Sequence, residues 1–432
     1  MSSFTEHSLR HDLAREVHAR PFERLRAPAR ASHIALLTGE GEGGRDVEHL
    51  AELCRRFDAP APEGDATHYS VDLGVFRCKW ERHTEFTSYT FYSDGAFEAP
   101  FADPVIGLVP GDWLAGVPGE LLVACHVAYS PKAKGQRRIG DLHEFFEADS
   151  LAGSEVAAEN AEAWTDFRIY EDGFGRILIR DAGLRTRQAG RLVQRLLEIE
   201  TYRLLALLAL PLARETGPEI GRAASELSAV TERMPQIAGL ADEHAMLEQL
   251  TRLAARMERL ASRNTFRFSA TAAYYALAEK RIEELRESRI EGIQTIREFM
   301  DRRMAPAMRT CQAIAARQER LAERIARTTT LLRTRVDIAM EEQNRDLLRS
   351  MDRRAKLQLR LQETVEGLSV AAISYYLVGL VGYAAKGLRE AGLAVPVNLV
   401  TGLSIPVVIV LVWFGVRRVR RRLGRAEEAE SL

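Results

Sequence analysis

The histidines are the first residues whose type could carry chemistry, because imidazole binds metals and transfers protons. Nine of the ten lie within residues 1–143. His7 and His11 are four residues apart, which would place both on one face of a helix, and His18 follows seven residues later. No HExxH motif and no CxxC pair accompanies them. We interpret them as surface or core histidines, with a metal site as the less favoured alternative.

Motifs for phosphate binding and nucleophilic catalysis are missing from the sequence. The glycines of GEGEGG (39–44) lack the spacing of a phosphate loop, and Glu40 and Glu42 would repel a phosphate. No GxSxG elbow is present. We therefore expect no cofactor and no enzymatic activity, although a catalytic pocket in the N-terminal part stays open as an alternative. The four cysteines form no CxxC pair, and we expect reduced, buried or semi-buried thiols at all of them: Cys54, Cys78, Cys125 and Cys311.

Charge is distributed unevenly along the chain. Residues 1–160 hold 26 acidic and 16 basic side chains, whereas residues 161–432 hold 35 acidic and 44 basic ones. An acidic front and a basic rear do not fit a nucleic-acid-binding domain, so we expect no nucleic acid partner. The pattern is typical of a soluble head joined to a part that approaches an anionic membrane.

Two uncharged segments near the C-terminus predict membrane-spanning helices. Residues 367–385 contain no charge over 19 positions, and residues 391–416 contain none over 26. A helix of this length crosses a hydrocarbon core of about 30 Å when its flanking residues reach the interface. We predict spans at about 367–385 and 397–416, with the lipid bilayer as a partner. A buried helical hairpin in a soluble core is the alternative.

Flanking charges predict the orientation of these spans. Only Lys386 and Arg389 are basic between them, whereas basic residues crowd both outer flanks. The positive-inside rule then places both termini in the cytoplasm, at the inner (plasma) membrane. No apolar signal segment occurs near the N-terminus, so we expect the front of the chain to be cytosolic. The predicted basic anchor after the second span consists of Arg417, Arg418, Arg420, Arg421 and Arg422.

The middle of the chain, residues 181–365, is rich in helix-forming residues. Pro211, Gly217-Pro218, Pro235 and Pro306 predict helix ends or kinks. No proline occurs from 307 to 395, so one helix could run from near Pro306 into the first span. An 11-residue repeat along it predicts an apolar stripe that other helices or other subunits must cover: Ile314, Ile325, Val336 and Leu347.

The front of the chain, residues 1–180, has mixed periodicity. Residues 32–38 and 119–129 are typical of buried strands, and residues 47–57 of an amphipathic helix. Residues 67–92 alternate like strands, and residues 163–180 predict a hairpin turning near Asp172-Gly173. We predict an α/β or α+β head over 1–180, a helical stalk or coiled bundle over 181–365, a transmembrane hairpin over 366–416 and a basic, then acidic cytosolic tail over 417–432.

This layout resembles the CorA-type divalent-cation transporters, in which a long stalk helix leads into the first of two spans. The resemblance implies a homo-oligomer, a pore lined by the first span and a divalent cation as a partner. That family closes its first span with a Gly-Met-Asn motif, and this chain has Gly382-Tyr383-Ala384 there instead. The likeness therefore covers the order of the elements.

A second resemblance covers nearly the whole chain. The segments EVHARPF (16–22), AGRLVQRLLEIETYRLLALLALPLA (189–213), LLRTRVD (331–337) and LQETVEGLSVAAISYY (361–376) are similar to the family called domain of unknown function 3422. That resemblance implies a membrane-anchored protein and assigns no activity.

Two functions follow as hypotheses. The first is an oligomeric membrane-anchored protein whose cytosolic head acts as a sensor or scaffold. The second is a cation channel or transporter, with Glu363 and Glu366 around the cytoplasmic mouth. The alternative role of the residues along its first span is helix packing, since small residues allow close approach. The predicted pore-lining residues share one helix face: Ser369, Ala372, Tyr376, Gly379 and Tyr383.

Overall fold

The computed structural model describes residues 6–11, 13–14, 21–39, 44–133, 142–237, 239–391 and 396–430; at Leu240 and beyond Arg418 it describes the backbone only. The strands are β1 (Ala29–Leu37), β2 (His68–Asp72), β3 (Arg77–Arg82), β4 (Phe86–Asp94), β5 (Glu120–Pro131), β6 (Ala152–Val156), β7 (Ala161–Thr165), β8 (Gly175–Asp181) and β9 (Ser288–Arg289). The α-helices are α2 (Arg45–Arg56), α3 (Gly111–Ala115), α4 (Thr186–Leu207), α5 (Ala209–Arg233), α6 (Leu240–Leu285), α7 (Ile296–Arg303), α8 (Ala305–Glu390) and α9 (Val397–Glu430). Short 3₁₀ turns are η1 (Val105–Leu108), η2 (Ala148–Ser150) and η3 (Met234–Gln236).

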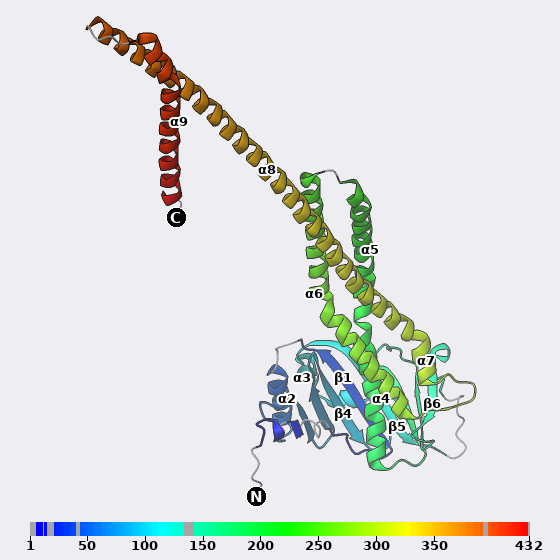
Figure 1. The fold of residues 1–432 in the computed structure, drawn as a ribbon. Coiled ribbons are helices and arrows are strands. Elements are labelled where there is room, and N and C mark those ends of the chain that lie inside the picture. Colours follow the sequence, from blue (N-terminus) through cyan, green and yellow to red (C-terminus); the bar gives the residue numbers. More distant parts are fainter. Residues whose placement is uncertain are drawn as a thin grey trace. The chain divides into compact units, whose positions relative to one another are not determined.

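The chain divides into two compact units. The head unit comprises Met1–Ile237 and Met246–Thr329, and the helical unit comprises Ala238–Ala245 and Thr330–Leu432. The head unit contains the whole sheet together with α4, α5, α7 and parts of α6 and α8 (Figure 1).

A nine-stranded mixed sheet forms the centre of the head unit, in the order β2-β3-β4-β1-β5-β8-β7-β6-β9. The β5–β8 pair is parallel, and the other pairs are antiparallel. The strands predicted at 32–38, 67–92 and 119–129 are confirmed as β1, β2 to β4, and β5. The predicted hairpin is confirmed as β7 and β8. The N-terminal part is therefore a mixed α/β domain.

One face of the sheet carries the main apolar core. Side chains alternate between the two faces along a strand, and Cys78 and Trp80 of β3 point to the same face as Phe91 and Tyr89 of β4. Helix α2 buries its apolar side here, as its amphipathic pattern predicted. Together with α3 these strands form one cluster: Ile34, Leu36, Val47, Leu50, Leu53, Cys54, Leu73, Phe76, Cys78, Trp80, Tyr89, Phe91, Val105, Val109 and Trp113.

The opposite face is covered by α4, and its apolar contact is much smaller. Ala35, Phe86 and Val123 of the sheet pack with Leu205 of α4, and Tyr202 and Tyr274 lie against them. This small cluster occupies only the Phe86 end of β4. On β3 and β4 the remainder of this face is polar and forms the cavity described below, whereas Ala31 of β1 and Val127 of β5 are buried apolar residues of the same face.

The prolines mark helix boundaries at most of the predicted positions. Helix α4 ends at Leu207 and α5 begins at Ala209, close to Pro211, while Pro306 is the second residue of α8. Pro235 lies in η3, directly after α5. Pro218 is different, because α5 continues through it from Ala209 to Arg233. Gly217-Pro218 is therefore not a helix end.

Within the head unit, α5, α6 and α8 meet around a buried polar contact. The Asn264 amide of α6 donates to Thr216 Oγ1 of α5 and to Gln318 Oε1 of α8, at 3.1 Å in both cases. Next to this contact α5 and α8 approach closely, because a Cβ added at Gly217 of α5 would lie 3.3 Å from Ile314 Cδ1 of α8. A buried amide that satisfies two partners favours one alignment of the three helices.

Helix α8 confirms the predicted continuous helix from near Pro306 into the first apolar segment. Its 11-residue repeat changes environment along the chain. Ile314, Ile325 and Val336 are buried, whereas Leu347 is 60% exposed. Near the start of the helical unit, Arg335 of α8 pairs with Glu243 of α6 at 3.0 Å. The apolar stripe is thus covered as far as Val336 and open beyond it.

Candidate functional site

Three strands present a polar face toward α4, and the register explains why. His33 of β1 lies opposite Thr90 of β4, which lies opposite Lys79 of β3. One step along, Glu81 of β3 lies opposite Ser88 of β4. These positions alternate with the apolar core residues, so they share the face covered by α4.

Helix α4 presents polar side chains to this polar face of the sheet. Gln194, Glu198 and Thr201 follow the i, i+4, i+7 spacing of one helix face. Leu197 and Tyr202 lie on the same side. A helix face packed on a sheet is usually apolar, so the polar residues here are an exception to amphipathic packing.

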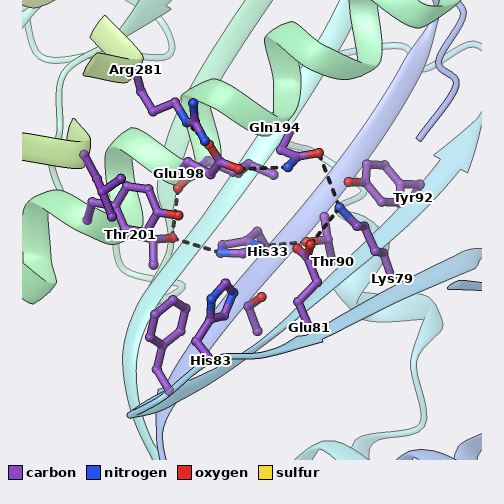
Figure 2. A pocket seen from close by; sticks show the side chains of 15 residues that line it. His33, Lys79, Glu81, His83, Thr90, Tyr92, Gln194, Glu198, Thr201 and Arg281 are labelled. Atoms are coloured by element: carbon purple, nitrogen blue, oxygen red, sulfur yellow. Dashed lines mark hydrogen bonds and ion pairs between the residues drawn. The ribbon is translucent and has the colours of Figure 1, made fainter. Parts of the chain in front are cut away.

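The two polar surfaces enclose a cavity of about 400 Å³, which we call the α4 cavity. Figure 2 shows its side chains converging from β1, β3, β4, α4 and α6. Its volume lies within the range of about 300–1,000 Å³ that is typical of small-molecule sites. The lining residues are His33, Lys79, Glu81, His83, Phe86, Ser88, Thr90, Tyr92, Gln194, Leu197, Glu198, Thr201, Tyr202, Leu277 and Arg281.

His33 is held between a strand and a helix. Its Nδ1 lies 2.8 Å from Thr90 Oγ1, and its Nε2 lies 3.1 Å from Thr201 Oγ1. The Thr201 hydroxyl donates to the Leu197 carbonyl, so toward His33 it can only accept. The proton of neutral His33 is therefore on Nε2. Burial, with a smaller effect of Lys79, lowers the pKa of His33 to about 3, which keeps the ring neutral.

A chain of charged groups crosses the cavity wall. Lys79 Nζ lies 3.1 Å from Glu81 Oε1 and donates to Gln194 Oε1 at 3.3 Å. The Gln194 amide donates to Glu198 Oε1 at 2.8 Å, and Arg281 donates to Glu198 Oε2 (Figure 2). Two cations and two carboxylates thus line the cavity, and the formal charges of its wall cancel when the lining histidines His33 and His83 are counted as neutral.

The wall lowers the stability of the fold compared with an apolar interface of the same size. The Lys79 side chain is only 5% exposed, and taking an ammonium out of water costs several kcal/mol even when it is paired. Well-packed apolar residues would stabilise this contact between sheet and helix more. Polar groups that converge on a cavity against this cost are characteristic of binding sites.

A second polar group in the head unit resembles a catalytic triad in composition only. Ser32 Oγ lies 2.9 Å from His126 Nδ1, and His126 Nε2 lies 3.8 Å from Asp172. Ser32 also accepts from the Ile106 amide, and both Ser32 and His126 are buried. Burial lowers the pKa of His126 to about 4. The group has no opening for a substrate next to the hydroxyl, and we interpret it as a structural contact.

The histidines considered first do not come together as a metal site in the residues that the structure describes. His7 and His11 are exposed near Glu6, and His18 lies outside the described residues. Over the described ranges, no group of three or more His, Cys, Asp or Glu side chains could hold a metal ion. All four cysteines are buried, free thiols.

The predicted pore-lining residues lie on α8 within the helical unit. Tyr376, Gly379 and Tyr383 line a cavity of about 670 Å³ between α8 and α9, together with Thr401. Ala372 is exposed, as are the mouth residue Glu363 and the hydroxyl-bearing Ser369, which donates to the Val365 carbonyl at 2.8 Å. Glu366 is half-buried.

The second predicted span has an aromatic and cationic end. The Arg417 guanidinium lies 4.9 Å from the centre of the Trp413 ring. Arg418 is exposed. The side chains of Arg420, Arg421 and Arg422 lie outside the described part of the structure.

Two helical stretches are long and apolar enough to cross a membrane, one within Ile296–Glu390 and the other at Val397–Arg418. Only 11% and 6% of their most apolar windows are buried. Core helices of soluble proteins are mostly buried, so this exposure agrees with lipid or partner contacts.

The α4 cavity was not identified from the sequence. In the sequence, Lys79 and Glu81 belong to the strand-like alternation of residues 67–92, which by itself does not show what covers the polar face. The available signal was on α4, where Gln194, Glu198 and Thr201 interrupt a helix face that Leu197 and Leu205 mark as buried.

Comparison with curated proteins and with solved structures found no significant match to this chain. The likeness to CorA-type transporters therefore stays a prediction. One protein family does match, over residues 5–423, and its description is "Protein of unknown function (DUF3422)". This match confirms the resemblance seen in the sequence, and the chain belongs to the DUF3422 family.

Proposed function

We propose that this protein is a membrane-anchored sensor whose cytosolic head binds a small polar molecule in the α4 cavity. The α4 cavity itself carries this proposal, because Lys79 and several hydrogen-bonding groups are buried, and the other paired charges half-buried, where an apolar contact would be more stable. The binding energy of a ligand would offset part of that cost.

The contacts around the cavity favour binding over catalysis. Both ring nitrogens of His33 are engaged by threonine hydroxyls, which leaves neither free to move a proton. Glu198 uses both oxygens on Gln194 and Arg281. Groups that already hold one another in place can orient a ligand, whereas a general base needs a free lone pair near its pKa.

The helical unit supports the anchor in this proposal. Large apolar side chains of α9 such as Leu403 and Leu411 are more than 60% exposed, which is costly in water and favourable in lipid. Trp413 and Arg417 are side chains typical of one membrane–water interface. Tyr383 and Lys386, whose Nζ lies 5.9 Å from the centre of the Tyr383 ring, are typical of the other. We infer that α8 and α9 cross the inner (plasma) membrane, with both termini in the cytoplasm.

Ligand binding can be tested on the full-length chain in detergent or nanodiscs. A protein-free metabolite extract should raise the thermal unfolding midpoint of the head, because a ligand that binds only the folded state stabilises it. Fluorescence of the buried Trp80, Trp113 and Trp164 reports the unfolding.

A filled cavity provides the control for this test. Ser88→Leu adds bulk at a buried position of the cavity lining. Ser70→Leu adds the same bulk at an exposed position of β2, outside the lining. The extract should stabilise the Ser70→Leu protein and leave the Ser88→Leu protein unchanged. Equal stabilisation of both variants, or none of the unmodified chain, would contradict a ligand site in the α4 cavity.

A further inference from the structure

We infer that the ligand of the α4 cavity is a free amino acid, recognised through both its carboxylate and its ammonium group. This inference rests on the proposed function and adds the chemical class of the ligand. Three features of the cavity carry it: the balance of its charges, the hydrogen-bonding capacity left over, and the change from a charged to an apolar lining.

The balance of charge excludes ligands of one sign. Lys79 is paired with Glu81 on the sheet, and Arg281 is paired with Glu198 on the helices. A simple anion or a simple cation would bring an uncompensated charge into a partly buried site, at a cost in desolvation. A zwitterion carries no net charge, and it presents a partner to each sign of the wall.

The hydrogen-bonding groups that remain unused include both donors and acceptors. An ammonium has three donors, and Lys79 uses two of them, on Glu81 and Gln194. Gln194 keeps one amide N–H beyond the one it donates to Glu198. These donors suit a carboxylate. On the other side, Lys79 contacts Glu81 through Oε1, and among the described residues no hydrogen bond or ion pair occupies Glu81 Oε2, so this oxygen can accept from an ammonium.

Lys79 and Glu81 are two positions apart on one face of β3, so a ligand's two charged groups must be close together. Consecutive side chains on one strand face are about 7 Å apart. Their charged ends approach to 3.1 Å in the structure. The carboxylate and ammonium of an α-amino acid are separated by a single carbon, which matches this arrangement.

Away from these charges the lining along β4 is apolar apart from His83, whose ring stacks on Phe86 with 4.1 Å between the ring centroids. Thr90 pairs with Lys79 and Ser88 pairs with Glu81, so Phe86 lies one step further along the same face. Leu277 and Tyr202 line the cavity as well, and Tyr202 packs with the Phe86 cluster. A polar end followed by an apolar end suits an amino acid whose backbone groups lie at Lys79 and Glu81 and whose side chain points toward Phe86.

The test compares three pools of probes on the full-length chain. The first is an equimolar mixture of free L-amino acids, the second the same mixture N-acetylated, and the third the same mixture C-amidated. N-acetylation removes the ammonium, and amidation removes the carboxylate. We expect the free pool to raise the unfolding midpoint, and we expect at least about tenfold weaker binding of both blocked pools, since a hydrogen bond to a charged group contributes that much.

Variants then assign each contact. Lys79→Met and Glu81→Gln should each weaken binding of the free pool by at least about tenfold, and Lys280→Met, at an exposed α6 position outside the lining, should not. The blocked pools test the inference on the unmodified chain, so the result does not depend on whether a variant folds.

The outcomes separate this inference from the proposed function. If the metabolite extract stabilises the head and the free amino acids do not, the ligand class is wrong and the sensor proposal stands. If all three pools act equally, recognition of the two charged groups is wrong. If neither the extract nor the pools stabilise the chain, the proposed function itself fails.

Discussion

His33 illustrates how a single buried residue couples the stability of the head to pH. Its two ring nitrogens connect β4 with α4 through Thr90 and Thr201, and the geometry requires the neutral ring. Its pKa falls from 6.5 to about 3 on folding, chiefly through burial. The unfolded chain therefore binds a proton between these values that the folded chain does not bind.

The sign of the pH dependence follows from this difference. The stability that neutral His33 gives the folded head is fully present above about pH 6.5 and is lost progressively as the pH falls toward 3. His126, whose pKa falls to about 4, contributes in the same direction. At about pH 5, His33 and His126 should each lower the free energy of unfolding by roughly 2 kcal/mol relative to neutral pH, since one pKa unit corresponds to about 1.4 kcal/mol.

A variant isolates the contribution of His33. His33→Gln keeps a donor and an acceptor but removes the titration, so its loss of stability between about pH 7.5 and about pH 5 should be about 2 kcal/mol smaller. Urea unfolding followed by tryptophan fluorescence measures this loss, with His143→Gln as an exposed control. The same pH dependence in His33→Gln and the unmodified chain would show that His33 does not titrate on unfolding.

At the scale of elements, α4 has to approach the N-terminal segment closely in order to cover the sheet. Gly190 allows this approach, because a Cβ built there would lie 1.6 Å from the Glu23 carbonyl oxygen. The Leu25 amide also donates to the Thr186 carbonyl at the start of α4, at 3.1 Å. Both contacts involve backbone, which has little freedom to move aside.

Gly190→Ala should therefore destabilise the head by about 3 kcal/mol, at the upper end of what overpacking usually costs. Gly221→Ala provides the control, because nothing lies within 4 Å of a Cβ at this α5 position. Alanine is the better helix former, so that variant should gain roughly 0.5–1 kcal/mol. Chemical unfolding midpoints measure both changes. A neutral Gly190→Ala variant would show that the segment around Glu23 does not pack on α4 as described.

Local patterns predicted the elements of the head better than their arrangement. The alternation around Trp80 and the apolar run in β5 predicted strands correctly, because side-chain period is a local property. The position of β1 between β4 and β5 depends on pairing between distant segments. The α4 cavity depends on the same long-range pairing, since Lys79 is buried only because α4 covers that face of the sheet.

At the scale of the whole molecule, the described part of the helical unit has a large exposed apolar surface. Along α8, Leu332 and Val336 are buried, whereas beyond them several large side chains are more than half exposed. The spans contain further exposed residues, which lipid can cover. The stretch before the first span is polar as well as apolar, and lipid does not reach it if residues 367–385 span the bilayer. Its exposed apolar residues are Leu347, Leu348, Met351, Leu357, Leu359 and Leu361.

We expect a second copy of the chain to cover this stretch, which makes the protein a homo-oligomer. The particle in detergent should then have a protein mass that is a multiple of 48.4 kDa. Leu347→Asp combined with Met351→Asp places charge on the apolar stripe and should reduce the mass to that of one chain, because burying an unpaired carboxylate costs several kcal/mol. Arg349→Asp, at an exposed position on the opposite side of α8 from Leu347 and Met351, should leave the mass unchanged.

Light scattering with the detergent contribution subtracted measures these masses. A monomeric unmodified chain would contradict the homo-oligomer, and it would also contradict the pore hypothesis, because two spans do not enclose an ion path. An assembly that survives both aspartates would place the contact elsewhere, with the spans themselves as the next surface to alter. An assembly of several copies that depends on Leu347 and Met351 would assign this part of α8 to self-association, and it would make the pore-lining prediction for Tyr376, Gly379 and Tyr383 testable by ion flux in vesicles.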